Sequence, residues 1–144
     1  MKVEEATARK ITMTEIDGLD PITVYIEDFN EGQGRVNITC YGETWSHYWG
    51  AMGKMGLIEF FCSCDKSYLF GKLSSSSYLE TDYEKISKAV GEEICQETLL
   101  LYEDKIIEEY GECWYHDLPQ KETDEYGYLC RIIDTVKNGL SGLK

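Results

Sequence analysis

Cysteine and histidine are the residues of this sequence whose types could bind a metal or attack a substrate. The segments "CSC" at residues 62–64 and "CWYH" at residues 113–116 together offer three thiols and an imidazole, which is a tetrahedral zinc set by residue type. The spacing argues against zinc, because structural sites use C-x₂₋₄-C knuckles, whereas Cys62 and Cys64 fall in a predicted helix and would point about 200° apart. We therefore expect buried thiols and no metal, with a thiolate metal site as the weaker alternative.

Nucleophilic catalysis and phosphate binding have no local signature in the chain. His47 and His116 are the two histidines, and neither lies in a pattern such as G-x-S-x-G. The segments "GAMGKMG" from Gly50 and "GKL" from Gly71 lack the complete G-x-x-x-x-G-K-[ST] pattern, so we expect both to be turns. The sequence thus predicts no catalytic residue and no cofactor, and it favours a protein that is not an enzyme.

Large aromatic residues gather in the segment "TCYGETWSHYWGAMG", from Thr39 to Gly53. If this turn is helical, Trp45 and Trp49 share one face, because they are four residues apart. We favour aromatic packing where a sheet gives way to a helix, and the alternative is a binding site for a protein or a small ligand. Stacking on a nucleobase needs positive charge nearby, and the neighbourhood offers Lys54 alone. The candidate residues of an aromatic site are Tyr41, Trp45, His47, Tyr48 and Trp49.

Acidic residues outnumber basic ones, with 27 Asp and Glu against 14 Lys and Arg and a formal net charge of −13. The excess is concentrated between Glu80 and Glu125, where 15 acidic and 4 basic residues give −11. One interpretation is a solvated acidic helix surface, and the sharper one is a docking face that imitates the closely spaced phosphates of DNA. The segment "EDKIIEEYGE" is the centre of this region, and its candidate binding residues are Glu103, Asp104, Glu108, Glu109 and Glu112.

The charge also excludes classes of partner. Nucleic acids and anionic lipid surfaces both require a basic footprint, so we expect neither direct nucleic-acid binding nor membrane binding. The natural complement is a protein with a basic surface. The N-terminal segment "MKVEEATARKITMTE" lacks the apolar core of a secretory signal, and no run approaches 18 apolar residues. We therefore expect a cytoplasmic protein whose six cysteines are mostly buried thiols.

Alternating segments rich in β-branched residues predict a sheet in the first part of the chain. Arg9–Ile16 and Ile22–Phe29 alternate on either side of the turn signal "DGLDP". Arg35–Gly42 follows the glycine-bearing turn "NEGQG" and places its apolar residues on one face. We expect a three-stranded antiparallel meander.

The hydrophobic period changes to that of a helix in the second part. An apolar stripe predicts a helix over Gly56–Phe70, and the capping-box spacing of residues 81–84 starts a second helix. A third helix is expected over Tyr102–Tyr110 and a last one from about Thr123 to Lys137.

Strands followed by helices indicate an α+β fold. We predict a single domain over residues 1–144, with residues 1–50 mainly in strands and residues 51–144 in about four helices packed on the sheet. An aromatic patch on so small a domain also favours a homodimer with twofold symmetry.

The first half of the chain carries a distinctive pattern between Leu19 and Leu73. The segment "LDPITVYIEDFNEGQGRVNITCYGETWSHYWGAMG", followed by "IEFFCSCDKSYLFGKL", resembles a family of small proteins encoded by tailed bacteriophages and prophages. The resemblance implies an accessory gene expressed in the bacterial cytoplasm, and it implies no particular activity. Small acidic phage proteins often bind and block a host protein, including nucleic-acid-binding defence complexes, so this context favours the acidic docking face.

Two functional hypotheses follow. The first is a phage or prophage protein that binds a host or phage protein with a basic surface, and that inhibits a nucleic-acid-binding or defence system through its acidic face. The alternative is a small-molecule or nucleotide-binding protein, or an enzyme, that uses the aromatic and glycine-rich junction at residues 41–53. Under this alternative, Trp49→Ala abolishes ligand binding without unfolding the protein.

Overall fold

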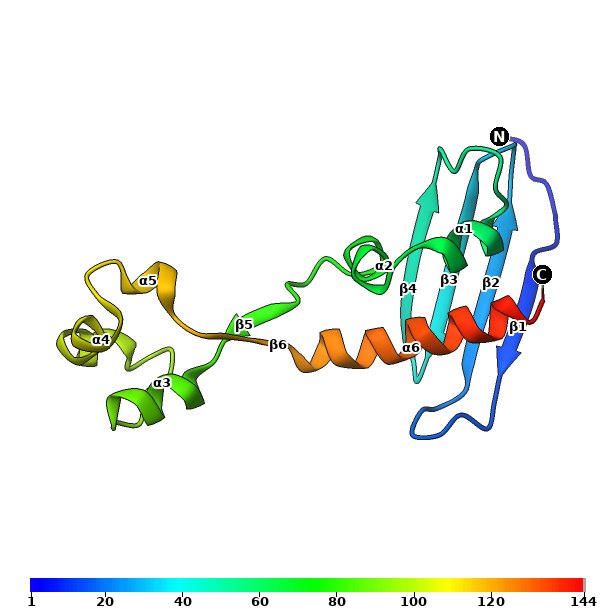
Figure 1. Ribbon diagram of the computed structural model, residues 1–144. Helices are drawn as coiled ribbons and strands as arrows, with labels where there is room; N and C mark the ends of the chain where they lie inside the picture. The colour runs from blue at the N-terminus through cyan, green and yellow to red at the C-terminus, as the bar shows by residue number, and fades with distance from the viewer. Residues whose placement is uncertain (144) are drawn as a thin grey trace. The chain divides into compact units, whose positions relative to one another are not determined.

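A computed structural model describes residues 1–143 of the chain (Figure 1). These residues divide into two compact units. The first unit comprises Met1–Ser76 and the chain from Gly127, and the second comprises Ser77–Tyr126. The predicted α+β class is confirmed, but the predicted numbers of elements were too low. Residues 1–143 contain a four-stranded antiparallel sheet followed by six α-helices. That the chain behaves as a single domain stays a prediction.

The first unit is built on an antiparallel meander whose spatial order is β1-β2-β3-β4. Its strands are β1 (Arg9–Met13), β2 (Ile22–Asp28), β3 (Gly34–Cys40) and β4 (Glu43–Trp49). The three predicted strands are therefore present as β1 to β3. Apolar residues alternate along β2 and β3 and are buried on one face of the sheet only.

The aromatic stretch forms β4 and not the start of a helix, so the prediction of three strands was wrong. Tyr41 and Gly42 have φ values of 49° and 77° and make a two-residue turn of the kind that joins paired strands. The chain then returns beside β3, with Trp45 opposite Ile38 and Trp49 opposite Gly34. Residues four apart share a face in a strand as well as in a helix, which is why the sequence pattern pointed to the wrong element.

The helix predicted over residues 56–70 is two helices, α1 (Leu57–Ser63) and α2 (Lys66–Leu73). The chain leaves the helical conformation at Cys64 and Asp65, which are both extended. The Asp65 side chain accepts a hydrogen bond from the Tyr68 backbone N–H at 2.8 Å and so begins α2. A helix-capping aspartate therefore interrupts an apolar stripe that looked continuous.

The last helix, α6 (Asp124–Ser141), crosses one face of the four-stranded sheet (Figure 1). The Tyr128 ring contacts the Trp45 ring of β4 with 6.1 Å between centroids, and the Tyr128 hydroxyl lies 3.6 Å from the Cys40 sulfur of β3. Toward the other end of α6, a Cβ at Gly139 would lie 2.5 Å from the Met13 methyl of β1. The apolar stripe of α6 is buried and includes Leu129, Ile132, Ile133 and Val136.

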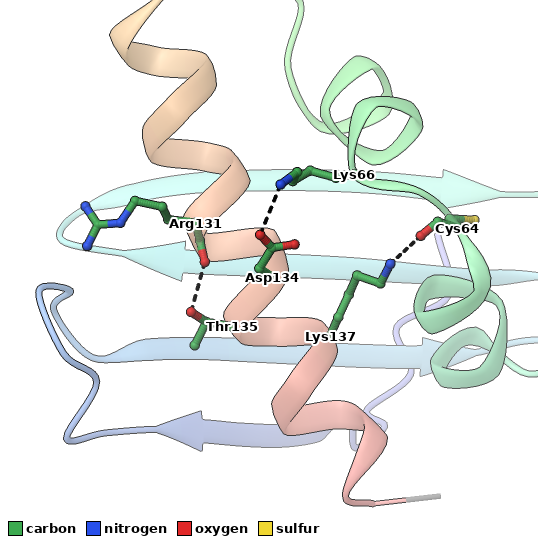
Figure 2. Close-up of polar contacts among 6 residues, drawn as sticks. All are labelled: Cys64, Lys66, Arg131, Asp134, Thr135 and Lys137. Atoms are coloured by element: carbon green, nitrogen blue, oxygen red, sulfur yellow. Dashed lines mark hydrogen bonds and ion pairs between the residues drawn. The ribbon is translucent and has the colours of Figure 1, made fainter.

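Polar contacts fix α6 beside the connection between α1 and α2 (Figure 2). The Lys137 ammonium donates to the Cys64 carbonyl oxygen at 2.5 Å, and the Lys66 ammonium lies 3.3 Å from the Asp134 carboxylate. The Cys64 carbonyl lies at the end of α1, where a cation is favourable.

The second unit has a hydrophobic core of its own, made of Ile86, Ile94, Ile106 and Trp114. The expectation that all later helices pack on the first sheet was therefore wrong, because the three helices of this unit bury side chains in the separate cluster. A two-stranded antiparallel sheet of β5 and β6 pairs Leu79 with Glu122. The elements of the unit are β5 (Leu79–Thr81), α3 (Tyr83–Val90), the 3₁₀-helix η1 (Leu99–Tyr102), α4 (Glu103–Tyr110), α5 (Trp114–Asp117) and β6 (Gln120–Glu122).

Candidate functional site

The acidic candidates lie on one short helix and the turn after it. Four of them belong to α4 and the fifth follows at residue 112. Ile106 is buried in the core of the second unit, and Ile107 and Tyr110 pack against that core, so the apolar positions of α4 turn inward. The carboxylates occupy most of the remaining positions, together with Lys105, and are all exposed: Glu103, Asp104, Glu108, Glu109 and Glu112.

These five carboxylates have few positively charged partners. None of them forms an ion pair with a residue between 1 and 143. The one base of α4, Lys105, forms its ion pair with Glu92, and this hydrogen bond raises the pKa of Lys105. The charge of Glu108 raises the same pKa to a smaller extent. The acidic surface of α4 therefore lies exposed to solvent.

The charge asymmetry of the sequence coincides with the division into units. Residues 77–126 hold 15 acidic and 4 basic residues, a balance of −11. The rest of the chain holds 12 acidic and 10 basic residues, a balance of −2. The first unit is close to neutral, so the negative potential of the protein arises almost entirely from the second unit.

Three of the aromatic candidates lie on the covered face of the sheet. Trp45 and Trp49 are buried in the core, and His47 lies between them with its ring centroid 4.7 Å from that of Trp49. The Trp49 indole N–H donates to the Tyr68 hydroxyl at 3.1 Å, and its ring contacts that of Phe61. Burial, and then the positive charge of Lys72, lower the pKa of His47.

The other two aromatic candidates lie elsewhere. Tyr48 is on the opposite, open face of the sheet, where its ring is 5.9 Å from that of Phe29. Tyr41 lies in the turn between β3 and β4 and is largely exposed. The five residues are therefore not brought together around one ligand position.

Two surface hollows are lined by other residues. One of about 420 Å³ lies at the start of α1, lined by Asp28, Gly56, Leu57, Ile58, Glu59 and Leu143. The other, of about 460 Å³, lies in the second unit and is lined by Glu80, Thr81, Tyr83, Glu84, Gln96 and Lys121. Neither lining includes a residue of the aromatic stretch.

The cysteines and histidines predicted as a weak zinc alternative are divided between the units. Cys62 and Cys64 belong to the first unit, and Cys113 and His116 belong to the second. Within residues 1–143, no group of three or more His, Cys, Asp or Glu side chains is placed to hold a metal ion. The expectation that the thiols are mostly buried was wrong, because Cys40 and Cys130 are buried, Cys62 and Cys64 are partly buried, and Cys95 and Cys113 are exposed. Partial burial raises the pKa of the Cys64 thiol.

Residues of the N-terminal pattern fix the sheet to the first helix. Asp28, at the end of β2, accepts a hydrogen bond from the Leu57 backbone N–H at the start of α1, at 2.9 Å. The Met52 backbone N–H donates to the Gly32 carbonyl at 2.8 Å. These contacts link segments more than 15 residues apart, so these members of the pattern have structural roles.

Asp28→Ala is expected to lower the free energy of unfolding by about 1 kcal/mol, because the first turn of α1 loses its acceptor. Asp28→Asn is the matched control, since the amide oxygen can still accept from Leu57. Chemical denaturation of the two variants measures the difference. Equal losses would contradict a capping role for this side chain.

No helix within the described chain combines the length and the apolar composition that a membrane crossing requires. The model of a phage protein family, Phage_phiTE_072, matches residues 1–142. This match extends through both units and well beyond Leu19–Leu73, the segment that carries the resemblance seen in the sequence. No curated protein and no solved structure matches the chain.

Proposed function

The chain belongs to the phage family Phage_phiTE_072, and from this membership we propose that it is a phage accessory protein that acts by binding another protein. The proposed binding surface is the acidic face of α4, with Glu103, Asp104, Glu108 and Glu109, continued by Glu112. The proposed partner is a host or phage protein with a basic surface.

The observation that carries this proposal is the charge of the second unit. A compact unit of 50 residues has a balance of −11, and its five central carboxylates are exposed and without an ion pair inside residues 1–143. Such a concentration of like charge destabilises the folded unit through self-repulsion. A complementary basic surface relieves the repulsion and is attracted over a distance of about 8 Å at physiological salt.

We propose that the basic surface normally binds nucleic acid, as in a host defence complex. DNA presents about one charge per 1.7 Å of its axis. With a rise of 1.5 Å per residue, the stretch from Glu103 to Glu109 spans about 9 Å and carries four carboxylates, or about one per 2–3 Å. Because successive residues turn by about 100°, the four side chains spread around about 240° of the helix, so the proposed partner is a groove lined with Lys and Arg on more than one wall.

The first experiment is a pull-down with the tagged protein from the bacterium that the phage infects, at low and at high salt. A stoichiometric partner that is lost at high salt, and that a DNA or RNA duplex displaces, would support inhibition through the acidic face. The absence of a partner at either salt concentration would overturn the proposal.

Reversing four charges, with Glu103, Asp104, Glu108 and Glu109 each changed to Lys, is expected to weaken binding to that partner by about 100-fold or more. The loss should lie mainly in the association rate, which should also become less dependent on salt, because most of the negative charge that steers the partner is removed. Surface plasmon resonance at several salt concentrations measures both rates.

The matched control reverses four exposed carboxylates of the first unit, namely Glu5, Asp17, Glu31 and Glu43. It changes the net charge of the protein by the same amount and leaves α4 intact. An equal loss of affinity in the two variants would mean that total charge matters and that α4 is not the binding face.

We do not propose a ligand site at residues 41–53. Trp45 and Trp49 are buried beneath the helices of the first unit, and they line neither of the two hollows described above. The cytoplasm of the bacterial host is the proposed place of action, since the proposed targets act there. The homodimer expected from the aromatic residues stays a prediction, and sedimentation of the purified protein would test it.

A further inference from the structure

We infer that Leu100 and Leu101 form the apolar anchor of the partner-binding surface, and that the partner presents an apolar patch bordered by Lys and Arg. This inference rests on the proposed function and names the chemistry of the same partner more closely. The two leucines lie on η1, which runs directly into α4. They are called the leucine pair below.

The leucine pair is exposed because of the period of its helix. A 3₁₀-helix has three residues per turn, so the first and fourth residues of η1 share one side. Leu99 and Tyr102 pack against the core of the second unit. This arrangement directs Leu100 and Leu101 outward, with exposed fractions of 70% and 79%. Two adjacent leucines this exposed, on an element with one apolar side already buried, indicate a surface that a partner covers.

Hydrogen bonds hold the leucine pair in a fixed position. The Thr98 hydroxyl accepts from the Cys95 backbone N–H at 2.9 Å, and the Leu101 N–H donates to the Thr98 carbonyl at 3.0 Å. One turn earlier, the Ile94 N–H donates to the Ser87 hydroxyl of α3 at 2.9 Å. A surface ordered before binding loses less conformational entropy in the complex, which favours affinity.

The charges around the leucine pair identify the occupant. Glu97 lies on one side in the sequence, and Glu103 and Asp104 lie on the other, all exposed. A hydrogen bond with Cys95 lowers the pKa of Glu97. An apolar spot with an acidic border is complementary to an apolar spot with a basic border, the usual form of a protein-binding hot spot with a polar rim.

The same charges argue against two other occupants. A second copy would place one acidic border against another, and like charges in contact are unfavourable. An anionic lipid surface would be repelled by the −11 of this unit in the same way. A basic, partly apolar protein surface is the occupant that both features of the site attract.

Two synthetic peptides test the inference even before the natural partner is identified. One is an amphipathic helix of about 18 residues with Leu on one face and Lys on the other, and the second has the same lysines with Gln in place of every Leu. The wild-type protein is expected to bind the Leu/Lys peptide at least about tenfold more tightly than the Gln/Lys peptide. Amide shifts in the NMR spectrum should centre on Thr98–Asp104.

The double variant Leu100→Ser, Leu101→Ser should remove this preference and leave binding of the Gln/Lys peptide unchanged. Tyr115→Ser is the matched control, because Tyr115 is another exposed apolar residue of the same unit, and it should keep the preference. Near-native NMR spectra of both variants confirm that they fold. If the wild type and the double variant prefer the Leu/Lys peptide to the same degree, the leucine pair is not the anchor.

The design separates failure of the anchor from failure of the proposed function. If reversal of the four α4 charges leaves the affinity for the Gln/Lys peptide unchanged, the acidic face itself is not a binding surface, and the proposed function fails with the inference. If that reversal weakens the binding of both peptides but the leucine variant binds both as the wild type does, the acidic face is a binding surface and the inferred anchor is wrong. If the wild type self-associates and the double variant does not, a second copy covers the leucine pair and the inferred partner is wrong.

Discussion

Trp49→Ala is expected to lower the free energy of unfolding by about 3–5 kcal/mol. The Trp49 ring is buried among Phe60, Phe61 and His47, with centroid distances between 4.7 and 6.4 Å, so its removal leaves a cavity where α1 meets β4. The variant also loses the hydrogen bond from the indole N–H to the Tyr68 hydroxyl. Denaturation followed by far-ultraviolet circular dichroism measures the loss.

Tyr48→Ala is the control for this prediction. Tyr48 is the preceding residue of the same strand, but its side chain lies on the open face and is about half exposed. Its removal is expected to cost less than about 1 kcal/mol. A Trp49→Ala variant that keeps wild-type stability and loses affinity for a small ligand would contradict the core role, and it would revive a ligand site at residues 41–53.

The sequence was sufficient to predict β1, β2 and β3, because alternation of apolar residues and turn signals agreed in those segments. It was insufficient for β4. A separation of four residues between Trp45 and Trp49 fits the face of a helix and the face of a strand equally well. The signal that could have decided is Tyr41-Gly42, two residues at the length of a tight hairpin loop, which requires a returning strand.

The helices show how local capping overrides a periodic pattern. Apolar residues continue through residues 57–68 at helical spacing, yet Asp65 ends that pattern by capping a new helix. The helix α4 of the second unit and the inward positions of α6, which lie in the first unit, were predictable because Ile106 and the apolar stripe of α6 have strong periodicity. The short β5, β6 and α5 were missed, since three or four residues are too few to show a period.

The candidate site also has a part that the sequence could predict and a part that it could not. The charges of Glu103 to Glu112 are evident in the sequence, and the exposure of these residues follows from the inward positions of Ile106 and Ile107. The exposed leucine pair was not predicted, because a run of leucines normally indicates a buried segment. Its exposure depends on η1 having three residues per turn, which no residue of the run specifies by itself.

Gly32→Ala is expected to lower the free energy of unfolding by about 2–5 kcal/mol, from two separate effects. Gly32 has a φ of +73°, which any other L-residue adopts at a cost of about 1–2 kcal/mol. A Cβ at this position would also lie 2.5 Å from the Gly53 carbonyl oxygen, a backbone atom that cannot rotate away. The clash would separate the β2–β3 turn from the segment before α1 and weaken the bond between Met52 and Gly32.

Gly53→Ala isolates the first effect, because Gly53 has a φ of +67° but no atom lies within 4 Å of the position of an added Cβ. This variant should lose about 1–2 kcal/mol, the conformational cost alone. The difference between the two variants in chemical denaturation therefore measures the contact between Gly32 and Gly53. If both variants lose the same amount, the turn moves freely and the close approach does not stabilise the junction. If Gly32→Ala loses more stability than Gly53→Ala, Gly32 is required because two backbone segments approach closely there. A ligand is then not needed to explain the glycines of this pattern.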